Sequence, residues 1–291
     1  MHASIIVPSY NSRSTIGACL TALQQQVTDF SYEIIVVDSS DDGTGELIES
    51  KFPAVKLIRM PQRTLPGLAR NLGIGKASGK ILAFTDSDCI PEANWLDKMI
   101  REQERGDCSV IGGSVLNGLP LNPVAWSGYL LEFSESLPSS SRRFVQLIPT
   151  CNVSIRREVF DRNGLFPTDV WPMEDGIFCM RLVRAGERLL FDPGIRVKHI
   201  FRPQLSAFLK HQIRLGKASA EARRRKEITQ AWLADHPLRW LGPLVRLSRL
   251  EIRLLCQSIP TFLGFNLLLP LCFGGLIAWG IGFCAPAHSQ S

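Results

Sequence analysis

Two carboxylates, Asp86 and Asp88, stand one residue apart just after the apolar run 81–84. Residues at i and i+2 share one side of an extended chain, where two like charges repel unless a cation lies between them. Mg2+ and Mn2+ prefer oxygen ligands and are usually held by one or two carboxylates together with substrate phosphates. The spacing therefore predicts either a metal and diphosphate site or an acidic turn before Pro91, which short motifs of this kind often form by chance.

The elements that must position these acids follow an alternating pattern. We predict strands at 3–9, 34–37, 55–58 and 81–85, with helices at 13–26, 45–51 and 68–76. This alternation is typical of βαβ units, hence of an α/β fold with a mostly parallel sheet that binds ligands beyond the carboxyl ends of its strands. Asp38 ends the second strand as Asp86 and Asp88 end the fourth. We expect all three acids at one edge of the sheet.

The pattern is less regular after Pro91. Residues 117–147 are rich in Pro and Ser and predict a long loop with one helix near 124–134. The other expected elements are helices at 94–105, 156–163 and 174–185, and strands at 110–113, 151–155, 188–191 and 197–199.

Several separated motifs occur in one order along the chain. They are Val7-Pro8-Ser9-Tyr10-Asn11, Val36-Val37-Asp38 followed by Asp41-Asp42-Gly43-Thr44, Ala69-Arg70-Asn71, Thr85-Asp86-Ser87-Asp88, the stretch 152–160, Gly164-Leu165-Phe166, Glu174-Asp175 and Val197-Lys198-His199. In this order and spacing, residues 3–200 resemble the family-2 glycosyltransferases. The resemblance implies the GT-A nucleotide-diphospho-sugar transferase fold and an inverting, membrane-associated hexosyltransferase of the bacterial cell-envelope or polysaccharide type.

The resemblance also implies roles for matched residues. Residues that match the donor-binding positions are Pro8, Tyr10, Asn11, Asp38, Arg70 and Asp86, and a Mg2+ or Mn2+ ion would be held by Asp88, Asp86 and His199. The catalytic positions match Asp175 and Glu174, and the acceptor contacts match Trp171 and Asn152. Family members often carry a second acid after the second strand, where this chain has Ser39, so the nucleobase of the UDP- or GDP-sugar stays open.

The implied chemistry suits these residue types. A metal at Asp88 would neutralise the diphosphate leaving group, and inversion by single displacement needs one base, which Asp175 matches. Each residue also has a structural interpretation: a helix-capping turn for Asp38, a helix-start acid for Asp175, a structural histidine for His199 and a core aromatic for Trp171. Arg63 and Arg70 face either the diphosphate or solvent.

The C-terminal third has a different composition. Residues 201–291 carry 12 Lys and Arg against 4 Asp and Glu, whereas residues 1–200 carry 21 against 23. A basic amphipathic helix is expected at 205–227, and residues 259–284 contain no charged side chain. That length predicts a transmembrane helix, a kinked span or a re-entrant segment, with a buried core helix as the alternative. The basic tail leads into apolar residues, which favours a membrane over nucleic acid as partner.

We therefore expect three regions. They are a catalytic domain at 1–203, with a nucleotide-sugar half at about 1–115 and an acceptor half at 116–203, basic interfacial helices at 204–258 and the apolar segment 259–284. Arg239, Arg246, Arg249 and Arg253 precede that segment and predict an inner-membrane protein with its catalytic domain in the cytoplasm. The N-terminus shows no secretory signal pattern. The eight cysteines lack framework spacing and are expected to be reduced and mostly buried.

The acceptor is expected to be lipid-linked or a cell-envelope glycan, and a polyprenyl-phosphate sugar synthase is a close alternative. A nucleotidyltransferase would usually place a glycine-rich loop after the first strand, and here no glycine occurs before Gly17. A noncatalytic membrane scaffold would not need Asp86, Asp88 and Asp175, all of which are present.

Overall fold

The computed structural model describes residues 1–286, which divide into two compact units. The sheet unit comprises Met1–Leu116 and Ser141–His199, and the helical unit comprises Asn117–Ser140 together with the chain from Ile200 onward. Residues 117–140, expected within the acceptor half of the catalytic domain, thus lie in the same unit as the C-terminal helices. The functional boundaries expected from the sequence stay predictions.

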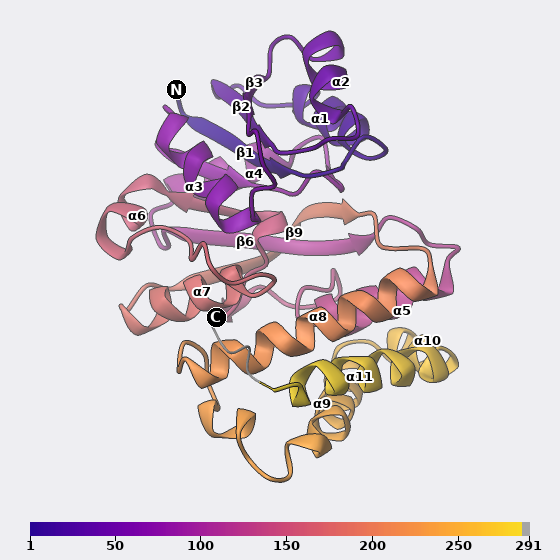
Figure 1. The fold of residues 1–291 in the computed structure, drawn as a ribbon. Coiled ribbons are helices and arrows are strands. Elements are labelled where there is room, and N and C mark those ends of the chain that lie inside the picture. The colour runs from indigo at the N-terminus through magenta and orange to yellow at the C-terminus, as the bar shows by residue number, and fades with distance from the viewer. Residues whose placement is uncertain (287–291) are drawn as a thin grey trace. The chain divides into compact units, whose positions relative to one another are not determined.

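Four parallel strands form one half of the sheet, in the order β3-β2-β1-β4. Their bounds are β1 (Ala3–Ser9), β2 (Tyr32–Asp38), β3 (Lys56–Arg59) and β4 (Ile81–Phe84), and the helices between them are α1 (Ile16–Gln24), α2 (Thr44–Lys51) and α3 (Pro66–Lys76). β1 and β4 are buried along their whole length because helices cover the sheet, and this explains their unbroken apolar runs. This half confirms the predicted βαβ pattern (Figure 1).

The other half is antiparallel, and here the expectation of a mostly parallel sheet is wrong. The order continues β4-β8-β6-β9-β5, with β7 on β9. The bounds are β5 (Cys89–Pro91), β6 (Val110–Asn117), β7 (Arg143–Val145), β8 (Val153–Arg156) and β9 (Leu189–His199), with helices α4 (Trp95–Glu104), α6 (Arg157–Asn163) and α7 (Glu174–Arg184) and a 3-10 turn at Thr150–Asn152. A parallel neighbour needs a crossover of a dozen or more residues, usually a helix laid on the sheet. The helix between β6 and β8, α5 (Pro123–Phe133), belongs to the helical unit instead.

Two local expectations also change. Pro91, before which an acidic turn was one expectation, is the last residue of β5 and the Cα partner of Val197. The segments expected as two short strands form one strand, β9. Its pairing with β5 places His199 directly opposite Cys89, a register on which the site depends.

Helix α3 lies unusually close to its neighbours in the sheet unit. A Cβ atom at Gly67 would lie 2.0 Å from the carbonyl oxygen of Pro167, and one at Gly73 would lie 2.5 Å from Cγ2 of Ile6 in β1. Spacings of three residues put Gly67, Arg70 and Gly73 on one side of the helix. Arg70 is therefore held inside the protein and is 2% exposed.

The helical unit is built on two helices, α8 (Leu205–Arg224) and α11 (Leu269–Cys284), which lie side by side in Figure 1. A Cβ at Gly216 would lie 2.0 Å from the carbonyl oxygen of Trp279, and one at Gly282 would lie 2.0 Å from that of Ile213. Glycine on both helices thus permits backbone contact. Helices α9 (Gly242–Gln257) and α10 (Ile259–Leu267) and short 3-10 turns at Ala231–Ala234 and Arg239–Leu241 connect them.

The apolar C-terminal segment does not form a single transmembrane helix, which was one expectation from its length, and the kinked span and the re-entrant segment stay predictions. Within residues 1–286, no single helix has both the length and the apolar character needed to cross a membrane, and α10 with α11 meet that test only as a pair bent by 77°. The helical conformation is interrupted at Leu268, and Pro270 lies in the first turn of α11. Arg246 and Arg253, expected only as charges flanking a span, bond within the unit to the carbonyl of Leu131 and to Glu135.

The close approach of α3 to β1 gives a stability prediction. Gly73→Ala should lower the free energy of unfolding relative to Gly75→Ala by about 1–3 kcal/mol, because overfilling a packed core outweighs the better helix propensity of alanine. Gly75 is the matched control in the same helix, since nothing lies within 4 Å of its Cβ position. Urea denaturation of the two variants checks this, and equal midpoints would contradict the proposed tight contact.

Candidate active site at the carboxyl edge of the parallel strands

A buried arginine links two acids that are far apart in the chain. The guanidinium of Arg70 donates to Oδ1 of Asp86 and to Oε1 of Glu174, each at 2.8 Å. Burial alone would lower the pKa of Arg70, but the two carboxylates more than offset it and the pKa is raised. Arg70 was expected to face either the diphosphate or solvent. It instead joins the turn after β4 to the start of α7.

The turn after β4 sends its two acids in different directions. The backbone N–H of Cys89 donates to the carbonyl of Asp86 at 3.0 Å, so residues 86–89 form a turn and not an extended strand. Asp86 bonds to Arg70, whereas Oδ1 of Asp88 lies 3.5 Å from Nε2 of His199. The expected pair of carboxylates sharing one side of the chain is therefore separated, and the charge of Asp86 is matched by arginine.

Three potential metal ligands do meet at this edge. Ligand atoms of Asp88, Cys89 and His199 all lie within 4.8 Å of one another. This set brings together Asp88 and His199 as predicted, adds Cys89, which was expected only as a buried apolar residue, and leaves Asp86 outside. The described donor atoms fit one divalent ion. Metal binding by Asp86 stays a prediction.

Asp38 lies at the end of β2 with an unsatisfied oxygen. The side chain is 1% exposed, its Oδ1 accepts from the hydroxyl of Ser40, and its Oδ2 is buried without a hydrogen-bond partner in the described part of the chain. Buried acceptors are normally satisfied, so this oxygen is available to a donor group of a ligand. Asn11, at φ 51°, accepts from the backbone N–H of Asp41 and so fixes the two loops that flank Asp38.

Aromatic side chains at the same edge flank Arg63. Its guanidinium carbon lies 4.7 Å from the ring centre of Tyr10 and 5.6 Å from that of Trp171. Tyr10 is 41% exposed, so a planar group can reach it from solvent. The structure thus brings the predicted donor residue Tyr10 beside the predicted acceptor residue Trp171. Pro8, another predicted donor residue, is buried in β1.

Asp175 lies near Arg70 but, unlike Asp86 and Glu174, forms no hydrogen bond with it. It follows Glu174 at the first turn of α7, and its Oδ1 accepts from the backbone N–H of Gly176 at 2.7 Å. Burial, and then the negative charge of Glu174, raise the pKa of Asp175 to about 6, against a lowering by Arg70. The side chain keeps partial exposure to solvent. A carboxylate with a pKa near 6 is suited to general-base work close to neutral pH.

Asn152 occupies a buried structural position, and the acceptor contact expected of it stays a prediction. The side chain is 0% exposed, and its oxygen accepts from the indole N–H of Trp95 at 2.8 Å. Its amide nitrogen donates to the carbonyls of Ser114 and Ile195 at 2.9 and 3.0 Å. The amide group is fully used in joining β6, β9 and α4, so we assign Asn152 to the core.

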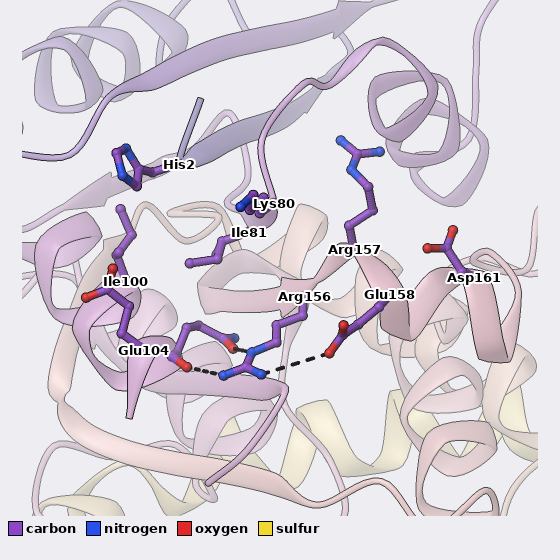
Figure 2. A pocket seen from close by; sticks show the side chains of 10 residues that line it. His2, Lys80, Ile81, Ile100, Glu104, Arg156, Arg157, Glu158 and Asp161 are labelled. Atoms are coloured by element: carbon purple, nitrogen blue, oxygen red, sulfur yellow. Dashed lines mark hydrogen bonds and ion pairs between the residues drawn. The ribbon is translucent and has the colours of Figure 1, made fainter. Parts of the chain in front are cut away.

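A pocket of about 660 Å³ lies at the opposite end of β4 (Figure 2). Ile81 begins β4 and pairs with Arg156, and both line this pocket. Arg157 donates there to the carbonyls of Ile74, Ala77 and Gly79 and so caps α3, while Arg156 bonds to Gln103. These arginines serve local structure, and the pocket lies away from the acids of the site.

Two features of this edge could not be read from motifs alone. The proximity of Cys89 to His199 follows from the β5–β9 register, and the only signal in the sequence was that Cys89 adjoins Asp88. Ser12 and Ser87 also join hydroxyl to hydroxyl at 2.6 Å, which links the loop after β1 to the acidic turn. The assembled edge brings together a group of possible ligands for a divalent ion, a buried acceptor oxygen without a partner among the described residues and a carboxylate of raised pKa.

The chain is similar to glycosyltransferases in sequence and in fold. The model of glycosyl transferase family 2 matches residues 4–164. Glycosyltransferase AglE of Haloferax volcanii is 31% identical over 241 residues, which are 80% of this chain and 74% of that protein. The Escherichia coli UDP-Glc:alpha-D-GlcNAc-diphosphoundecaprenol beta-1,3-glucosyltransferase WfgD is 25% identical over 233 residues, 79% of this chain and 83% of that one. Mannosyltransferase PcManGT from Pyrobaculum calidifontis, solved with GDP-Man and Mn2+, has a TM-score of 0.64 and 19% identity, and the match covers 96% of this chain and 86% of that chain.

The linkage through Arg70 gives a second prediction. Arg70→Met should lose about 3–5 kcal/mol of stability because it leaves the buried carboxylate of Glu174 and the partly buried one of Asp86 without their cation. Adding Glu174→Gln should restore part of that loss, since it removes one of the unmatched charges. Thermal unfolding of the single and double variants measures both effects.

Arg59→Met is the control, since Arg59 pairs with Glu46 while both side chains stay exposed. Such a surface pair is worth about 0–1 kcal/mol. An Arg70→Met protein as stable as Arg59→Met would contradict the linking role.

Proposed function

Because the chain belongs to glycosyl transferase family 2, we propose that it transfers a hexose from a nucleotide-diphospho-sugar to a lipid-linked or cell-envelope glycan acceptor, with inversion. One observation carries the proposal. A cluster of metal ligands at Asp88 and His199 and an acid of raised pKa at Asp175 lie at the same strand edge, joined through Arg70, Asp86 and Glu174.

The donor half of the proposal rests on Asp38 and its surroundings. The buried Oδ2 of Asp38 can accept from an N–H or hydroxyl of the nucleoside, and the exposed ring of Tyr10 offers a stacking surface. A divalent ion held by Asp88 and His199 would neutralise the charge that develops on the leaving diphosphate. The solved complex of PcManGT with GDP-Man and Mn2+ supports a sugar nucleotide and Mn2+ as the first combination to test.

Asp175 is proposed as the base. Above its pKa of about 6 it is ionised and can take the proton of an acceptor hydroxyl as the new bond forms. Glu174 is paired with Arg70 at 2.8 Å and acts by position, because its negative charge raises the pKa of Asp175. Asp86, bonded to the same arginine, is placed to fix the turn that carries Asp88.

The acceptor proposal rests on the helical unit and on one relative. WfgD is named for transfer to a sugar on diphosphoundecaprenol, and the residues of this chain after Ile200 are strongly basic. A polyprenyl phosphate as direct acceptor is the alternative within the same class. Product analysis separates the two: mild acid cleaves the sugar–phosphate bond, so it releases the transferred sugar as a free monosaccharide from a polyprenyl phosphate and as part of a larger glycan from a lipid-linked sugar.

We propose that the helical unit docks on an anionic membrane surface and does not cross the membrane. Large apolar side chains that are at least 41% exposed are concentrated on α9–α11: Leu244, Val245, Ile252, Leu255, Ile259, Leu263, Leu267, Phe273, Ile277 and Ile281. Soluble proteins rarely expose many such side chains together. The excess of Lys and Arg in the same region complements anionic lipid, which favours a membrane as the occupant. We propose the cytoplasmic leaflet as its location.

The catalytic proposal predicts different losses at two acids. Asp175→Asn should bind the donor unchanged but transfer at least about a hundredfold more slowly, because only proton removal is lost. Asp88→Ala should lose turnover and metal-dependent donor affinity together. The measurements are donor affinity by calorimetry and transfer by a product assay with nucleotide sugars and Mn2+.

The same assay tests pH dependence and stereochemistry. Since the base works when ionised, turnover of the wild type should fall as pH drops through about 6. NMR of the product should show the anomeric configuration opposite to that of the donor. Retained configuration, or full activity with excess chelator, would reject the mechanism.

Membrane docking predicts binding of the full chain to vesicles. Sedimentation with vesicles containing phosphatidylglycerol should carry down more protein than with phosphatidylcholine alone, and added salt should weaken it. The double variant Leu263→Glu and Leu267→Glu should bind at least about tenfold more weakly because two apolar contacts are lost.

Val27→Glu is the matched control, as it changes an apolar side chain of similar exposure in the sheet unit. Equal loss in the control would refute docking through α10. So would a stable dimer in solution that the double variant dissociates.

A further inference from the structure

The β5–β9 register places a thiol among the ligands of the proposed metal site. Cys89 pairs with His199 across the two strands, and Asp88 directly precedes Cys89. Sγ of Cys89 lies 3.9 Å from Oδ1 of Asp88, which in turn lies 3.5 Å from Nε2 of His199. One ligand atom from each of the three residues lies within 4.8 Å of those from the other two.

These separations suit a small tetrahedral ion. Zinc bonds of about 2.3 Å to sulfur and about 2.0–2.1 Å to nitrogen or oxygen require ligand atoms roughly 3.3–3.6 Å apart. The observed separations of 3.5 and 3.9 Å lie within a few tenths of an ångström of that range. Three protein ligands of this kind leave one position open, as catalytic and exchangeable zinc sites do.

The donor set also discriminates between ions by chemistry. Mg2+ takes octahedral oxygen coordination and Mn2+ suits carboxylate and water, whereas thiolate and imidazole select Zn2+ and its heavier relative Cd2+. A cysteine thiol of ordinary pKa carries its proton at neutral pH. A thiophilic ion replaces that proton, which passes to solvent, and forms a metal–sulfur bond without any redox change.

We propose that Asp88, Cys89 and His199 form a site for a thiophilic divalent ion of the Zn2+ and Cd2+ class, which excludes the ion that supports transfer. The exclusion, unlike the binding itself, rests on the proposed function, in which Asp88 and His199 hold the productive ion. One carboxylate and one imidazole cannot complete two ion shells at once. A thiolate-bound ion also has a single open position, where an octahedral ion keeps several for diphosphate oxygens.

Neighbouring thiols define the controls. Cys151 lies within hydrogen-bonding reach of Cys89 but is not part of the cluster around Asp88 and His199. Cys256 is exposed and can bind Cd2+ adventitiously. Cys151→Ser and Cys256→Ser should therefore leave the site intact, and Cys89→Ser should remove its sulfur.

The first experiment is a titration of the reduced, metal-free full chain with Cd2+, followed by the ultraviolet sulfur-to-cadmium charge-transfer band. The wild type, Cys151→Ser and Cys256→Ser should each show a band that saturates at one equivalent. Cys89→Ser should lose the band, and His199→Gln should bind Cd2+ at least tenfold more weakly. A band that survives Cys89→Ser, or disappears with Cys256→Ser, would overturn the proposal.

A second measurement needs no variant. X-ray absorption of the wild-type protein with one equivalent of Zn2+ should show a single sulfur together with nitrogen and oxygen ligands. A shell of nitrogen and oxygen alone, or of two sulfurs, would refute this ligand set.

Electron paramagnetic resonance separates this inference from the proposed function. Protein-bound Mn2+ should be released to solution as Zn2+ is added, at one ion for one in the wild type and at no less than tenfold higher free Zn2+ in Cys89→Ser. Bound Mn2+ that Zn2+ fails to displace defeats the inference and leaves the proposed function standing. A cadmium band in a protein that binds no Mn2+ supports the thiophilic site and defeats the metal assignment of the proposed function.

Discussion

A buried guanidinium between two carboxylates is the interaction on which the rest of the site depends. Arg70 cannot shed its proton in a protein, so its burial at 2% exposure has to be matched by charge. Asp86 and Glu174 supply that charge from the turn after β4 and from the start of α7. The close approach of α3, which Gly67 and Gly73 permit, brings the arginine to both acids. The positions of the two acids in the sheet unit therefore depend on how closely α3 packs against its neighbours.

The balance of charge around this arginine also explains the proposed base. Three carboxylates, those of Asp86, Glu174 and Asp175, lie near a single cation, and two of them bond to it. The third is left with a backbone N–H as its donor and with the negative charge of Glu174 beside it. Its pKa rises to about 6 for that reason. The raised pKa of the proposed base thus depends on the pairing of Asp86 and Glu174 with Arg70. That pairing is a property of the folded protein and not of the Glu174-Asp175 dipeptide.

Features that depend on interactions between residues close in the sequence could be predicted from it, whereas features that depend on tertiary contacts could not. The alternation of buried strands and helices up to β4 is local and was read correctly, as was the meeting of Asp88 with His199, which the motif order implied. The inward direction of Arg70 and the commitment of Asn152 to carbonyls of β6 and β9 depend on tertiary contacts. Polar residues inside a motif look alike whether they bind ligand or hold strands together. The antiparallel half of the sheet was missed because α5, the helix between β6 and β8, belongs to the helical unit.

The environment of the C-terminal apolar segment is also not determined by its local sequence. Length and absence of charge cannot distinguish a helix that crosses a membrane from one that packs against another helix, because both environments are apolar. Glycine spacing carries the missing information. Gly275 and Gly282 are seven residues apart on α11, and Cβ atoms there would meet Phe208 at 2.5 Å and the carbonyl of Ile213 at 2.0 Å, both on α8. A repeat of seven keeps one side of a helix toward a partner. The glycines thus mark the buried side of α11, and its exposed apolar residues, such as Ile277 and Ile281, are the ones through which we propose that it contacts a membrane surface.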